Sequence, residues 1–164
     1  MKLVLINKNI ESYLQQSKII DYNNPIIQTK IMEFQQRGNT KQEWAKLAFE
    51  FVRDEIKHSF DINSTIATVL ASETLEKREG ICFAKAHLLA AFLRGMGIPS
   101  GFCYQRVTRK GTPESGYALH GLNAVYSNES DQWFHLDPRG NKPGISSEFS
   151  VHPEKLAYPP FELN

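Results

Sequence analysis

The sequence predicts an α+β fold in which N-terminal helices and a cysteine-bearing helix pack on an antiparallel β-sheet. Apolar residues recur at helical spacing through residues 24–56 and again through residues 82–95. From residue 101 to residue 137 the pattern changes to strands separated by polar turns. Helices first and strands second are typical of the α+β class.

Composition limits the function classes. The chain has 164 residues, enough for a substantial core, and we expect a single domain over residues 1–164. A net charge of +1 predicts neither nucleic acid nor a membrane as partner, since both need a strong basic excess. The apolar run of residues 3–6 is too short for a signal-peptide core or a membrane span, so we expect a cytoplasmic protein.

The cysteines and histidines do not predict a metal site. A structural disulfide between Cys82 and Cys103 is not expected in a reducing cytoplasm. There is no Cys-x-x-Cys pair, and the five histidines lack zinc-ligand spacing. A phosphate-binding glycine loop is also missing. We therefore predict neither a metal nor a cofactor.

The first helices have clear start signals. Residues 2–6 are interpreted as a short strand or an extended opening segment, and residues 11–21 as a segment that wraps over the core. Asn24 and Pro25 mark a helix start, because Asn is a good N-cap and Pro fits the first helical position. Gly38 ends this helix. Its predicted apolar stripe is Ile27, Ile31 and Phe34.

A second helix opens at Thr40, where Thr40 and Glu43 form a capping box. Its predicted buried face consists of Trp44, Leu47, Ala48, Phe51, Val52 and Ile56. A short helical piece is expected over residues 72–77.

Residues 82–95 have the pattern of a buried helix with Cys82 in its first turn. Gly80 allows a sharp entry, and Gly95 and Gly97 end the helix. A thiol in this position meets the positive end of the helix dipole and unpaired backbone N–H groups, which both favour the nucleophilic thiolate. Free cysteines are more often small buried hydrophobes, so the helix alone leaves both interpretations open.

Three strands are predicted at residues 101–107, 117–126 and 132–137, and an irregular tail follows Pro138. The short turn between the second and third strands indicates an antiparallel hairpin. This pairing brings His120 near Asp137, so a triad of Cys82, His120 and Asp137 is geometrically possible. Taken singly, His120 is more often a hydrogen-bonded strand residue and Asp137 a turn residue.

Three motifs together resemble the transglutaminase-like superfamily. The run from Gly80 through Cys82 to Pro99 is similar to its cysteine motif, residues 120–126 to its histidine strand, and residues 133–138 to its aspartate motif. They follow one another in the family's order within a core of about residues 44–141. The resemblance implies a papain-like core with a Cys82–His120–Asp137 triad. The chain also resembles a group of small bacterial transglutaminase-like proteins.

The sequence departs from the family at two points. Many members read His-Ala-Trp where this chain has His120-Gly121-Leu122, so an aromatic wall beside the base is missing. Many read Asp-Pro-Thr where this chain has Asp137-Pro138-Arg139.

The resemblance implies a cysteine enzyme that forms a thioester from an amide of a peptide or protein. Transfer to water would make it a peptidase or amidase, and transfer to an amine acceptor a protein-glutamine acyltransferase. Tyr104, Gln105 and Arg139 are the predicted substrate-binding residues, with anchoring of the tail as the alternative for Arg139. A catalytically silent peptide-binding module is the alternative function.

Overall fold

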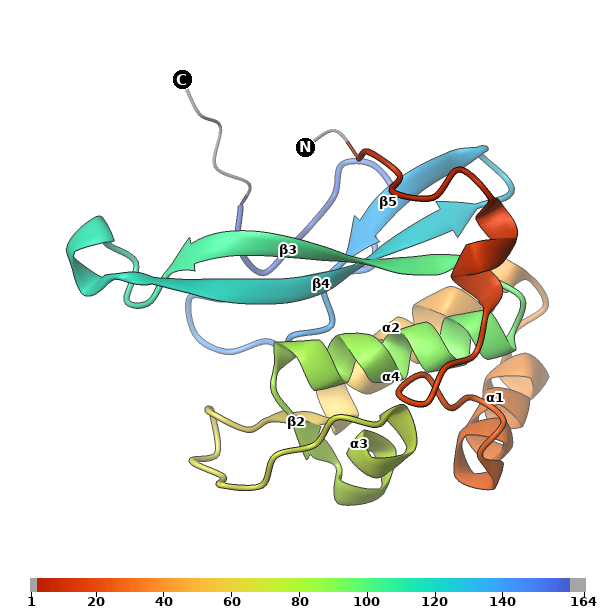
Figure 1. Cartoon of the computed structure of the whole chain (residues 1–164), viewed down its shortest axis with the longest axis horizontal. Coiled ribbons are helices and arrows are strands. Elements are labelled where there is room, and N and C mark those ends of the chain that lie inside the picture. Colours follow the sequence, from red (N-terminus) through yellow and green to blue (C-terminus); the bar gives the residue numbers. More distant parts are fainter. Residues whose placement is uncertain (1–2, 160–164) are drawn as a thin grey trace.

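The computed structural model describes residues 3–159 and places a layer of helices against a three-stranded antiparallel sheet (Figure 1). The helices are α1 (Pro25–Arg37), α2 (Lys41–Glu55), α3 (Ala71–Lys77) and α4 (Cys82–Gly95), with 3-10 turns η1 (Ile10–Leu14) and η2 (Pro113–Ser115). The sheet contains β3 (Ser100–Thr108), β4 (Tyr117–Ser127) and β5 (Gln132–Leu136) in that order. A small parallel pair, β1 (Lys57–His58) and β2 (Glu79–Gly80), precedes α4.

The predicted helix starts are confirmed. The side chain of Asn24 accepts a hydrogen bond from the Ile26 N–H at 3.1 Å, and that of Thr40 accepts one from the Glu43 N–H at 3.1 Å. The carboxylate of Glu43, however, accepts from the Asn39 N–H, so it reaches one residue beyond the cap itself. The stripe predicted on α1 is buried.

The predicted buried face of α2 is partly wrong. Ala45, Ala48, Phe49 and Val52 are the buried residues of this helix, whereas Trp44, Leu47 and Phe51 are half-buried. Phe51 packs against Phe34 of α1 and Phe92 of α4 but stays half-buried, whereas Phe49 is fully buried and packs against Phe149 of the irregular tail. Trp44 lies at the margin, where its indole N–H donates to the Gly38 carbonyl at 2.8 Å.

Helix α4 is the centre of the fold and is buried nearly all round. It contacts α2 and α3 on one side and β4 on the other, as Figure 1 shows. Even Lys85 is fully buried within it. A helix enclosed in this way needs apolar residues on every face, which is the composition of residues 82–95.

The three predicted strands of the sheet are confirmed with small shifts of their ends. Gln105 pairs with His120, and Asn123 pairs with Leu136. Asp137 directly follows the last pair and therefore lies at the level of Leu122, two residues from His120. The side chain of Asn123 donates to the Ala86 carbonyl at 2.9 Å and fixes β4 on α4.

Of the two alternatives for residues 2–6, the short strand is wrong for residues 3–6, which have no regular secondary structure and are mostly exposed. Lys2 lies outside the described residues. Residues 11–21 contain part of η1 and then run irregularly, with Tyr13 edge-on to Trp133 of β5 at 4.9 Å between ring centroids. The helix expected at residues 72–77 is α3, and the tail after Pro138 is irregular as predicted. Within residues 3–159, no helix combines the length and apolar character needed to cross a membrane.

Candidate active site

Cys82 is the first residue of α4, directly after the β1–β2 pair. The Ser59 N–H donates to the Gly80 carbonyl at 3.2 Å, which fixes the chain two residues before the cysteine. A Cβ on Gly80 would lie 2.8 Å from the Cβ of Ala84, so glycine permits the tight entry into the helix. The side chain of Cys82 therefore emerges at the N-terminal end of a rigid, buried helix.

His120 and Asp137 form a buried pair at the same end of the sheet. Nε2 of His120 lies 2.8 Å from Oδ2 of Asp137, and the two residues are 4% and 1% exposed. Backbone N–H groups fix the carboxylate: Ala157 donates to Oδ2 and Arg139 to Oδ1, each at 3.2 Å. Because Asp137 occupies Nε2, the other ring nitrogen of His120 is left for the cysteine.

Contacts around the sulfur favour the thiolate. Burial raises the pKa of the Cys82 thiol, but hydrogen bonds with the His120 ring and with the backbone N–H groups of Gly121 and Phe83 outweigh it and hold the pKa below its ordinary value. Burial lowers the pKa of His120, but Asp137 and Cys82 together raise it to about 9. Both shifts favour a thiolate–imidazolium pair.

Cys103 offers a contrast within the same chain. It lies on β3 opposite Leu122, and burial raises the pKa of its thiol to about 11. Cys103 therefore stays a thiol at neutral pH, although both cysteines are free.

The three predicted substrate-binding residues have different surroundings. Tyr104 is exposed in the middle of β3, and its ring lies 5.9 Å from that of Phe83, the residue after Cys82. Gln105 is buried opposite His120, and its side-chain amide donates to the Tyr158 carbonyl at 3.4 Å.

Arg139 lies inside an ion pair. Its guanidinium donates to both carboxylate oxygens of Asp61 at 2.6 and 2.9 Å and to the Tyr158 hydroxyl at 3.2 Å. Arg139 in turn holds the pKa of Asp61 well below its usual range. This arrangement is the anchoring alternative, and a substrate carboxylate would have to displace Asp61 to bind here.

Tyr158 is a site residue that the sequence did not indicate. Its ring stands edge-to-face against the His120 imidazole, with 4.8 Å between centroids and an angle of 72°. A single tyrosine in an unpatterned tail gives no signal from which this contact could be found.

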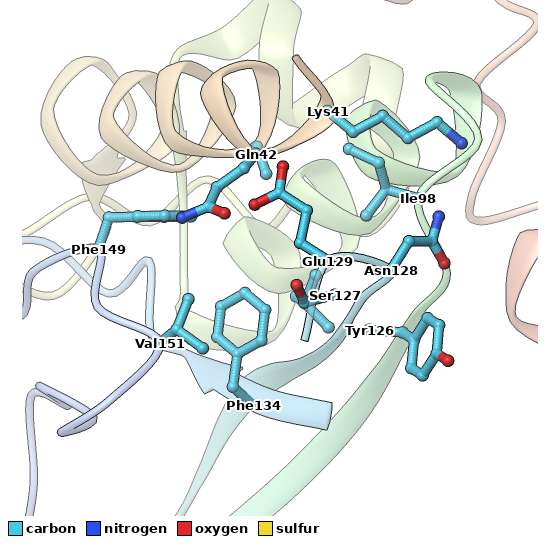
Figure 2. A pocket seen from close by; sticks show the side chains of 12 residues that line it. Lys41, Gln42, Ile98, Tyr126, Ser127, Asn128, Glu129, Phe134, Phe149 and Val151 are labelled. Carbon is cyan, nitrogen blue, oxygen red and sulfur yellow. The ribbon is translucent and has the colours of Figure 1, made fainter. Parts of the chain in front are cut away.

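An apolar pocket at the far end of α4 is not part of this site. Phe134, Phe149 and Val151 line it, with Lys41 and Glu129 at its rim (Figure 2). Its lining includes Ile98, which follows the C-terminal end of α4, whereas Cys82 begins the helix. At 1.5 Å per residue the length of α4, about 20 Å, separates the two places.

Among residues 3–159, no group of three or more His, Cys, Asp or Glu side chains is arranged to hold a metal ion.

Comparisons with known proteins agree with this fold. The sequence matches the model of the transglutaminase-like superfamily over residues 29–138. A solved structure of a candidate cysteine protease from Cytophaga hutchinsonii is similar, with a TM-score of 0.63 and 20% identity over 82% of this chain and 43% of that one. The periplasmic domain of TgpA from Pseudomonas aeruginosa is also similar, with a TM-score of 0.58 and 19% identity over 79% of this chain and 46% of that one.

At 20% and 19% identity, the two solved structures support the fold alone. The chain spans less than half of the length of either. No curated protein matches the sequence.

Proposed function

We propose that this chain, which belongs to the transglutaminase-like superfamily, is a cysteine enzyme that acts on an amide bond of a peptide or protein through a thioester on Cys82. The observation that carries the proposal is the buried His120–Asp137 pair, 2.8 Å between Nε2 and Oδ2, beside a thiol that begins a helix. A nucleophile, a base and a group that orients the base are the three parts that such chemistry needs.

In the proposed reaction the Cys82 thiolate attacks the amide carbonyl carbon. We take the backbone N–H of Cys82, at the start of α4, as the proposed donor to the developing oxyanion. The His120 imidazolium gives its proton to the departing amine, the C–N bond breaks and a thioester remains. Neutral His120 then takes a proton from water or from an acceptor amine, which attacks the thioester, and the C–S bond breaks.

The identity of the acceptor separates two activities within this proposal. Water would give a free acid and make the protein a peptidase or amidase, whereas an amine would give a new amide and make it an acyltransferase. We also propose a cytoplasmic location, in which Cys82 and Cys103 stay reduced. The periplasm is the alternative, since the TgpA domain is periplasmic.

A pH profile tests the triad. We expect turnover of a peptide amide to follow a bell, with an acid limb below the ordinary thiol pKa of about 8.5. The alkaline limb should fall near pH 9, because above the raised pKa of His120, about 9, the imidazolium that protonates the leaving amine is lost. Labelling of Cys82 by iodoacetamide should already be fast at pH 6, measured in a Cys103→Ser background. If labelling at pH 6 is slow and its rate rises with pH as for an ordinary thiol, the silent peptide-binding module is favoured instead.

The predicted contact of Tyr104 with substrate extends to a larger apolar surface. Figure 1 shows β3 and β4 running beyond the first turn of α4. Tyr104 pairs with Gly121, which touches Phe83, and Leu119 shares their face because side chains alternate along a strand. Tyr104 and Leu119 are 57% and 59% exposed. We propose that they receive an apolar side chain next to the reacting amide.

This surface predicts a substrate preference that one substitution should reduce. Peptides with Leu beside the reacting amide should be turned over with a higher kcat/KM than the same peptides with Asp. In Leu119→Ser the ratio of kcat/KM for the Leu peptide to kcat/KM for the Asp peptide should fall about tenfold. This is the size expected for the loss of one apolar side-chain contact. Met32→Ser, at a similarly exposed position on α1 (52%), is the matched control and should leave this kcat/KM ratio unchanged. Equal ratios in the wild type and Leu119→Ser would contradict the proposed surface.

A further inference from the structure

The segment formed by residues 154–158, named the strap here, is bonded at successive points to β5, to the irregular tail and to Asp137. The Glu154 carboxylate lies 2.8 Å from Nδ1 of His135 and accepts from the backbone N–H of the same residue at 2.8 Å. The Lys155 carbonyl accepts from the Glu148 N–H at 3.0 Å. The Ala157 N–H donates to Oδ2 of Asp137 at 3.2 Å, the same oxygen that binds His120. The strap thus ends on the carboxylate of the proposed triad.

Tyr158 is held at both of its ends. Its carbonyl accepts from the Gln105 side chain at 3.4 Å, and its hydroxyl accepts from Nε of Arg139 at 3.2 Å. Arg139 is itself fixed by both oxygens of Asp61. Between these two attachments the Tyr158 ring meets the His120 ring at 4.8 Å. The ring therefore has little freedom to leave the imidazole.

The Tyr158 ring covers the His120–Asp137 pair and keeps water from it. Tyr158 is half-buried, whereas His120 and Asp137 are almost inaccessible. Excluding water strengthens a charged hydrogen bond and keeps its geometry fixed. The Ala157 N–H restrains the carboxylate on one side, and the Tyr158 ring restrains the imidazole on the other.

We propose that the strap belongs to the catalytic machinery, with Tyr158 as a positioning residue that keeps His120 seated on Asp137 and shielded from water. This inference rests on the proposed function of the triad. It gives Gln105 and Arg139 a shared role, since both hold Tyr158 and neither needs to touch the substrate.

The test compares Tyr158→Ala with Tyr158→Phe in the full chain. A proton held between His120 and Asp137 gives a far-downfield proton resonance when water is excluded. The resonance should be present in the wild type and in Tyr158→Phe and lost by exchange in Tyr158→Ala. Turnover of Tyr158→Ala should fall about tenfold in kcat with little change in KM, because an orienting group acts on the chemical step. Lys18→Ala, a change at an exposed position outside the strap, should alter neither readout.

Thermal unfolding of each variant separates positioning from loss of structure. If Tyr158→Ala does not fold, Tyr158→Leu, which keeps apolar bulk without the ring, should lose the resonance in the same way. A retained resonance with kcat within twofold of the wild type would overturn the inference while fast labelling of Cys82 left the proposed function standing. Slow labelling of wild-type Cys82 would instead count against the function, and the resonance would still decide whether the strap shields the pair.

Discussion

Replacing His120 with alanine is expected to lower turnover at least about 1,000-fold, since members of a triad act as a unit. The substitution removes the proton donor for the leaving amine. It also removes the hydrogen bond that offsets the burial of Cys82, so the pKa of the thiol should rise. Both effects act on the same reaction, and the second can be measured without a known substrate.

The substrate-independent measurement is the rate at which iodoacetamide labels Cys82 at pH 6 in a Cys103→Ser background. An ordinary thiol, with a pKa of about 8.5, is less than about 1% thiolate at this pH. We therefore expect His120→Ala to slow labelling about 30-fold or more, after allowing for the greater nucleophilicity of a more basic thiolate.

His87→Ala is the matched control for this variant. His87 lies on the same helix, and its ring contacts the Val69 carbonyl at 2.9 Å. Labelling should stay within twofold of the wild type. Equal effects of the two substitutions would show that the reactivity of Cys82 depends on the packing of α4 and not on a pairing with His120.

The sequence allowed the proposal of Cys82, His120 and Asp137 because each lies in a segment whose secondary structure local patterns predict. A glycine before an apolar helical run places Cys82 at a helix start, and the short turn after residue 127 sets the pairing of β4 with β5. Register then brings His120 and Asp137 to neighbouring positions. These inferences need only contacts between segments that are close in sequence.

The remaining site residues depend on contacts between distant segments. Arg139 meets Asp61 across 78 residues, and Ala157 meets Asp137 across 20 residues of irregular chain. Neither pairing leaves a periodic signal. The buried face of α2 differs from the prediction for a related reason: stripes through Phe49 and through Phe51 both fit a helical period, and Phe49 packs against Phe149 of the distant, irregular tail.

Lys85 is the least predictable buried residue, because a lysine in a helix is ordinarily exposed. It is fully buried, and its ammonium nitrogen contacts the Ile56 carbonyl and, at 3.4 Å, the Arg53 carbonyl. These carbonyls lie at the C-terminal end of α2, where helix carbonyls lack partners within the helix. Lys85 thus joins the end of α2 to α4, one turn after Cys82.

Replacing Lys85 with methionine, which has similar length and no donors, is expected to lower the free energy of unfolding by about 2–4 kcal/mol. The loss leaves the buried Ile56 carbonyl and the partly buried Arg53 carbonyl without this donor. Urea denaturation at pH 7 provides the measurement. Lys46→Met, an exposed residue of α2 in a surface ion pair with Glu50, is the matched control and should change stability by less than about 0.5 kcal/mol.

The pH dependence of this loss distinguishes the hydrogen bonds from the charge. Burial, assisted by the nearby Arg139, lowers the pKa of Lys85 from 10.5 to about 7. Between these values the unfolded chain binds more protons than the folded one, so the contribution of Lys85 to stability rises with pH and is lost as pH falls through 7. A neutral amine still donates to both carbonyls without a buried charge. The destabilisation by Lys85→Met should therefore be larger at pH 9 than at pH 6, and a smaller loss at pH 9 would show that the charge at the end of α2 is what stabilises the fold.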